Sequence, residues 1–195
     1  SECLIGLPNG ARIEQLAAHL DDPNPSLRGQ IRDALVRFGN QSEFESIVRS
    51  SVEVVLNAAG WRGQEQACLI LGELDYEPAS ARLVELLNSS RPEVAIASAW
   101  ALRKIAVAET LPAMLAQAEQ QTAQPQGDDL TAVDRQVAHL FEAMALMNHR
   151  PAIELMRTYV PKDLSHRRLS RGAAVWGLGY LLAEAKNEAL EAQLM

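Results

Sequence analysis

Apolar residues recur at spacings of three and four along most of the chain, a pattern that predicts amphipathic α-helices. Short amphipathic runs, such as IEQLAAHL at 13–20 and SARLVELL at 80–87, are followed by turns rich in Pro, Asn, Asp and Ser, and then by a longer apolar run. We therefore predict repeated pairs, each made of a short first helix and a longer second helix. The predicted second helices are 25–38, 60–74, 92–107, 131–147 and 166–183.

Three of these runs share a similar opening, since LRGQIRDAL, WRGQEQACL and SRGAAVWGL start at Leu27, Trp61 and Ser170. Aligning all five on their closing leucine produces equivalent positions separated by 34, 33, 44 and 32 residues. The long step contains residues 118–130, whose Gln, Pro, Gly and Asp content predicts a loop insertion. The regular period otherwise predicts stacked repeats that bury one another's apolar faces. The equivalent positions are Arg28, Arg62, Ala95, His139 and Arg171.

Both ends of the sequence look like parts of further repeats. ECLIGL at 2–7 is similar to the end of a second helix, and NEALEAQLM at 187–195 is similar to the start of a first helix. We therefore expect residues 1–195 to form a single repeat domain that is a segment of a longer array, or else has a damaged repeat at each end.

The second helices resemble those of HEAT repeats, close to the variety found in bilin-lyase subunits. Typical features are a Pro-x-[Val/Leu]-Arg opening and a later Ala-Leu-Gly. The matching residues are Pro25-Ser26-Leu27-Arg28 with Ala34-Leu35, Pro92-Glu93-Val94 with Ala101-Leu102, and Arg171 with Gly177-Leu178-Gly179; the fourth unit matches less well, with His139 and Ala145-Leu146. The resemblance implies an all-α, right-handed α/α superhelix of the HEAT/armadillo type, with about five stacked helix pairs. It implies that the second helices line the concave surface, and it specifies no activity.

The composition agrees with a globular protein, since 48% of the 195 residues are hydrophobic and 22% are charged. The longest apolar runs are shorter than the roughly 20 residues of a membrane span, so we expect a soluble chain and favour a cytoplasmic location. A net charge of −7 argues against sequence-independent nucleic-acid binding. The basic cluster at 162–171 is interpreted as a solvated turn, with an anionic contact patch as the alternative.

The two cysteines take equivalent small positions beside a closing leucine. If neighbouring helices pack 8–10 Å apart, Cys3 and Cys68 lie roughly 20 Å apart, too far for a disulfide. We predict two free and largely buried thiols.

No residue pattern indicates catalysis. The four histidines are scattered, without an i, i+4 His pair or a His-Glu dipeptide of the kind that metal-binding helices use. The iron site of deoxyhypusine hydroxylase, an enzyme built on this repeat, is therefore not implied. We predict no enzymatic activity, no metal and no cofactor. The histidines are His19, His139, His149 and His166.

A column of residues on the second helices is the predicted ligand site. The position two before each closing leucine is expected to face outward, and it holds Asp33, Ala67, Trp100, Met144 and Trp176. Neighbours four residues away extend the column, which becomes apolar and aromatic towards its end. Such residues are typical of peptide-binding surfaces, although a tryptophan here could instead pack over a neighbouring helix. The predicted binding residues are Trp100, Lys104, Phe141, Met144, Trp176, Tyr180 and Gly172, which is expected to leave a hollow beside Trp176.

The register arginines have a structural interpretation. We expect Arg28, Arg62 and Arg171 to tie the helix starts to acids or carbonyls of neighbouring turns rather than to a ligand. The candidate acids are Asp21, Asp22 and Asp163.

These observations favour a non-enzymatic scaffold that binds a protein or peptide on its concave face. The alternative is a regulatory or structural segment of a larger polypeptide, enzymatic or not. A nucleic-acid-acting enzyme of HEAT-like fold is a remote third hypothesis, against which the acidic charge argues.

Overall fold

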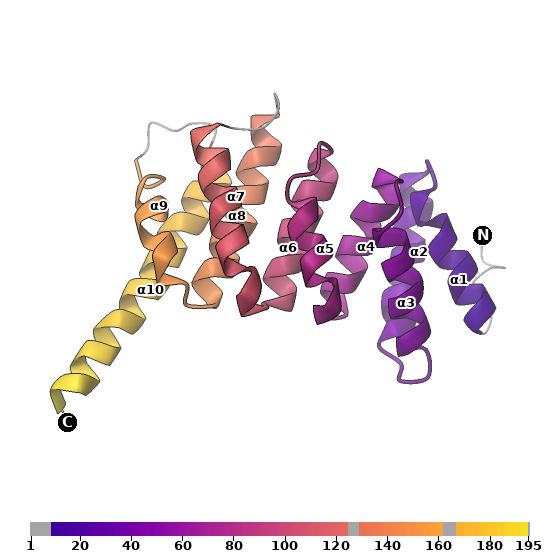
Figure 1. The fold of residues 1–195 in the computed structure, drawn as a ribbon, viewed down its shortest axis with the longest axis horizontal. Coiled ribbons are helices and arrows are strands. Elements are labelled where there is room, and N and C mark those ends of the chain that lie inside the picture. Colours follow the sequence, from indigo (N-terminus) through magenta and orange to yellow (C-terminus); the bar gives the residue numbers. More distant parts are fainter. Residues whose placement is uncertain (1–8, 125–128, 162–166, 195) are drawn as a thin grey trace. The chain divides into compact units, whose positions relative to one another are not determined.

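The computed structural model describes residues 9–124, 129–161 and 167–194, with the side chains described up to residue 183. This part of the chain is all-α, with ten α-helices joined by turns and short 3₁₀ segments. It divides into two compact units, Ser1–Ile105 and Ala106–Met195. In Figure 1 the helices of each unit follow one another in sequence order. How the two units stack stays a prediction.

Unit 1 contains six helices that contact their neighbours in sequence. The second helices α2, α4 and α6 lie side by side in this order, because α4 contacts both of the others. Helices α1 and α3 also contact each other. The six helices are α1 (Gly10–Ala18), α2 (Pro25–Gly39), α3 (Glu45–Leu56), α4 (Trp61–Glu73), α5 (Ser80–Leu86) and α6 (Pro92–Ile105).

Unit 2 contains four helices arranged around α8. Helix α8 contacts α7 on one side and α10 on another, and α9 packs against α10. The four helices are α7 (Leu111–Ala123), α8 (Leu130–Leu146), α9 (Ile153–Arg157) and α10 (Arg168–Leu194).

The five predicted second helices are confirmed as α2, α4, α6, α8 and α10. Two boundary predictions are wrong. Residues 118–123 are not a loop, since they form the end of α7, and their Ala, Gln, Glu and Thr include no breaker. Helix α10 runs through AEAKN at 183–187, where a break between units was predicted. Alanine, glutamate, lysine and leucine are strong helix formers, and nothing after Gly179 interrupts them.

Three junctions between a second helix and the next first helix share one backbone course. In each, a non-glycine residue with a positive φ follows the second helix, and a short 3₁₀ turn precedes the first helix. The positive-φ residues are Asp75, Ala106 and Asn148, with φ of 50°, 53° and 52°. The 3₁₀ turns are η3 (Glu77–Ala79), η4 (Ala108–Thr110) and η5 (Arg150–Ala152). Because a positive φ is costly for residues with a Cβ, its recurrence marks the same local turn geometry three times.

Side-chain oxygens satisfy the free N–H groups at the starts of the second helices. Asn24, the residue immediately before α2, caps this helix, with its Oδ1 3.0 Å from the backbone nitrogen of Ser26. Two other helices are capped from outside: Asp21 accepts a hydrogen bond from Gly63 N–H of α4 at 2.9 Å. Asp134 of α8 accepts from Leu169 N–H and Ser170 N–H of α10, at 2.8 and 2.9 Å.

Each unit has its own apolar core. In unit 1 the core includes Cys68, which is fully buried and free, as predicted; burial raises the pKa of its thiol well above the usual range. Cys3 lies outside the described residues. In unit 2 the rings of Phe141 and Tyr159 meet edge to face, with centroids 4.9 Å apart.

Candidate functional site

An open groove of about 660 Å³ lies on α2, α4 and α6 of unit 1. Its walls combine polar and apolar side chains. All three helices are predicted second helices, and Asp33 and Trp100 of the predicted column are among the lining residues. The lining residues are Gln30, Arg32, Asp33, Val36, Arg37, Leu69, Glu73 and Trp100.

The position of Trp100 depends on a glycine in the neighbouring helix. A Cβ added to Gly72 would lie 2.8 Å from Cζ3 of Trp100 and 2.9 Å from Cα of Ala101. Helices α4 and α6 therefore approach closely at this point, and the half-buried indole covers the place where a side chain of α4 would otherwise lie.

Lys104, one turn after Trp100, contacts two lining residues of the groove without lining it itself. Its Nζ lies 5.5 Å from the centre of the Trp100 ring, within the range of a cation–π interaction. The same Nζ is 3.4 Å from Oε2 of Glu73 on α4. Trp100 and Lys104 both belong to the predicted binding column, and the structure brings them together.

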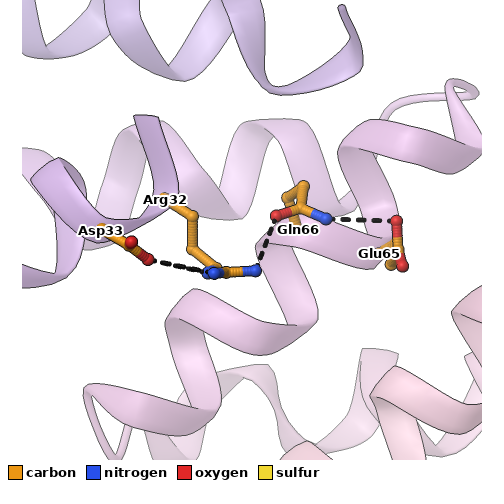
Figure 2. Close-up of polar contacts among 4 residues, drawn as sticks. All are labelled: Arg32, Asp33, Glu65 and Gln66. Carbon is orange, nitrogen blue, oxygen red and sulfur yellow. Dashed lines mark hydrogen bonds and ion pairs between the residues drawn. The ribbon is translucent and has the colours of Figure 1, made fainter. Parts of the chain in front are cut away.

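Arg32 of α2 links this helix to α4 through its side chain, as Figure 2 shows. Its Nη2 is 3.0 Å from Oδ1 of Asp33, and its Nη1 donates to Oε1 of Gln66 on α4 at 3.4 Å. Nε2 of Gln66 in turn donates to Oε2 of Glu65 at 3.1 Å. The guanidinium of Arg32 is thus held by two acceptors and its charge is compensated by Asp33.

The lining of the groove contains two cations, Arg32 and Arg37, and two anions, Asp33 and Glu73. Arg32 pairs with Asp33, and Lys104 beside the groove pairs with Glu73. Arg37 has no ion-pair partner among the described residues. Both acids of the lining therefore have a partner, and one of its two arginines does not.

Several residues on or beside the predicted column are buried rather than outward-facing. Ala67, Phe141 and Met144 have no solvent exposure, so the expectation that they face outward is wrong. Ala67 is buried because α4 contacts α2, α3 and α6. Phe141 and Met144 are buried on α8, which has α7 and α10 as neighbours.

The remaining predicted binding residues, Gly172, Trp176 and Tyr180, lie on α10 in unit 2. Trp176 and Tyr180 are 48% and 39% exposed, and their rings stack with centroids 5.7 Å apart. A Cβ added to Gly172 would meet no atom within 4 Å, so the space beside it is open. Neighbouring Leu169 and Val175 are also about half exposed.

The register arginines make different contacts. Nη1 of Arg28 donates to the carbonyl oxygens of Asp22 and Pro23 at 2.8 and 3.2 Å. Nε of Arg171 donates to the carbonyl oxygen of Val160 at 2.9 Å. The guanidinium of Arg62 lies 4.6 Å from the centre of the Trp61 ring.

The candidate acids do not pair with these arginines through the contacts the structure describes. Asp21 caps α4, and the carboxylate of Asp22 accepts from Asn24 N–H at 2.8 Å. Asp163 lies outside the described residues.

Sequence reasoning missed several lining residues, chiefly Arg32, Leu69 and Glu73. Leu69 is a closing leucine and was expected in the core, yet it is half-buried and lines the groove. Another closing leucine, Leu146, is 52% exposed. One available signal was Gly72, because a glycine inside a helix often marks close packing against a neighbour.

Substituting Gly72 with alanine should destabilise unit 1 by about 1–3 kcal/mol, because the added methyl group overlaps both the Trp100 ring and the backbone of Ala101. The backbone cannot move aside without separating α4 from α6. Urea unfolding followed by circular dichroism measures the change. Gly29→Ala is the matched control, since a Cβ there meets nothing within 4 Å; equal effects of the two changes would contradict the close approach of α4 and α6.

The described residues show neither a membrane-spanning helix nor a cluster of metal ligands. In the described part of the chain, none of the helices combines the length and apolar character needed to cross a membrane. Those residues also include no cluster of three or more His, Cys, Asp or Glu side chains that could hold a metal ion.

Comparison with known proteins did not identify a family. No protein-family model matches the chain, and neither does any of the curated proteins searched. The resemblance of the helix pairs to HEAT repeats therefore stays a prediction from the sequence.

Proposed function

We propose that this chain is a non-enzymatic binding module, a HEAT-like right-handed solenoid whose second helices hold a protein or peptide. The observation that carries the proposal is the groove on α2, α4 and α6, with a half-buried tryptophan at its side. Three successive second helices contribute to it, as expected for the ligand-facing surface of such an array.

The lining suits a peptide. Val36, Leu69 and Trp100 offer apolar area, and aromatic residues bury much surface at low entropic cost. Gln30 and the charged residues around them provide polar contacts at the edges. None of the described histidines lines the groove, and neither does buried Cys68, the one cysteine that the structure describes.

The test uses the purified chain and a displayed library of random peptides. For the selected peptides, Trp100→Ala should weaken binding by about tenfold or more, because tryptophans are frequent energetic centres of interfaces. Trp61→Ala is the matched control: Trp61 is also half-buried and lies in the same unit, but it does not line the groove. Val36→Gln, on the opposite helix, provides a second test that leaves the packing of Trp100 on α4 intact.

Melting curves separate loss of binding from loss of fold. Weakened binding by Trp100→Ala and Val36→Gln, with little change for Trp61→Ala and with helicity retained, supports the groove. Equal weakening by all three variants, or none by any of them, would contradict it.

A second candidate is a regulatory or structural segment of a larger polypeptide. The exposed apolar face of α10 favours it, because soluble surfaces seldom expose several large apolar side chains together. Failure of every peptide at the groove would favour this candidate. The face contains Leu169, Val175, Trp176, Tyr180 and Leu182, each 39–49% exposed.

A further inference from the structure

We propose that the groove of unit 1 binds an extended peptide that carries a carboxylate for Arg37 and, beside it, an apolar side chain for the surface formed by Val36, Leu69 and Trp100. This inference rests on the proposed function and deepens it, because it states the chemistry of the bound segment.

Both anions of the groove have partners. Asp33 accepts from Arg32 through Nη2 and Nε, at 3.0 and 3.2 Å. Glu73 lies 3.4 Å from Nζ of Lys104. The charge of each carboxylate is thus already compensated, so a further pairing with a basic ligand brings little net gain.

Arg37 is in the opposite situation. It is exposed and lines the groove, and none of the described residues is its ion-pair partner. A carboxylate can approach it without displacing any contact. A planar guanidinium can also donate two parallel hydrogen bonds to one carboxylate. An acidic side chain would therefore be held in a defined orientation as well as attracted by the positive charge.

The apolar surface lies within the same groove. Val36 precedes Arg37 on α2, and Leu69 and Trp100 come from α4 and α6. The three apolar residues are half-buried, so each has surface left for a ligand to cover. An acidic residue followed closely by an aliphatic or aromatic one fits this arrangement better than a uniformly acidic segment does.

The experiment uses the full chain and soluble fluorescein-labelled octapeptides. Each has a central Leu, flanked at one position by Asp, Asn or Lys. For wild type we expect affinity to decrease from Asp to Asn to Lys, by about tenfold over the series at low salt. We expect the difference to shrink as salt is raised, because exposed charges are screened. Replacing the central Leu with Ser should weaken binding of all three peptides.

The variant Arg37→Glu should invert the order of the peptides while the requirement for Leu remains. Arg157→Glu is the matched control, since it changes the net charge equally, and Arg157 is exposed and does not line the groove. This control should keep the wild-type order. Because both arginines are exposed, neither change is expected to unfold the chain, and circular dichroism verifies this.

Four outcomes would overturn the inference, and they differ in what they say about the proposed function. Leu-dependent binding with no preference among Asp, Asn and Lys, or equal effects of the two arginine variants, contradicts the role of Arg37 but leaves peptide binding standing. Binding of none of the peptides contradicts both. Binding of a labelled oligo-dT 12-mer that Arg37→Glu abolishes, in the absence of peptide binding, would replace the peptide with a single-stranded nucleic acid.

Discussion

Replacing Asp134 with alanine should lower the free energy of unfolding by about 3–5 kcal/mol, among the largest effects of any single substitution in this chain. The carboxylate is buried, and it accepts hydrogen bonds from Leu169 N–H, Ser170 N–H and the hydroxyl of Ser170. Alanine would leave these donors without their acceptor at the start of α10. It would also remove a negative charge from the positive end of the helix dipole. Urea unfolding followed by circular dichroism measures the loss.

Asp129→Ala is the matched control for this effect. Asp129 also accepts two backbone hydrogen bonds at a helix start, from Thr131 and Ala132, but it is exposed. Water can replace it there, so we expect a cost of about 1 kcal/mol. A loss for Asp134→Ala no larger than that for Asp129→Ala would show that burial of the carboxylate contributes little to the docking of α10 on α8.

Phe141→Ala should cost about 3–5 kcal/mol, because it removes a fully buried ring and leaves a cavity. The ring packs edge to face on Tyr159, whose side chain is 1% exposed. Thermal unfolding measures the cost, and Phe141→Leu should recover most of the stability because it refills much of the volume.

Tyr180→Ala is the comparison that separates the core from the surface on the same predicted column. Tyr180 is 39% exposed and stacks on Trp176, so its truncation should cost about 1 kcal/mol or less. If Phe141→Ala instead left the melting temperature unchanged and weakened ligand binding, the role first expected for Phe141 would be correct after all.

The helices themselves were predictable because local chemistry specifies them. Pro25 marks the start of α2, and the structure has it in the first turn of that helix, as expected. The end of α10 was not predictable in the same way. A regular repeat suggested a break near residue 183, but no residue there terminates a helix, and helix propensity dominates.

The candidate site was predictable only in part, for a reason of packing. Trp100 and Lys104 were found because a spacing of four places them on one helix face. The exposed face of α4 could not be predicted in this way, because it depends on how many neighbours the helix has. With α2, α3 and α6 in contact, Ala67 is buried, and Leu69 and Glu73 reach the groove instead. Periodicity describes a helix alone and carries no information about its second and third neighbours.

The positive-φ residues Asp75, Ala106 and Asn148 bear on how such a chain can change over evolutionary time. The three turns follow one backbone course with three different residues at the positive-φ position, so the junction between helix pairs keeps its geometry whichever of these residues stands there. Duplication or exchange of one pair would need new side chains only on the faces that meet adjacent pairs. The groove could thus acquire a different ligand preference through a cassette-like replacement, while the turns that define the boundaries remain as they are.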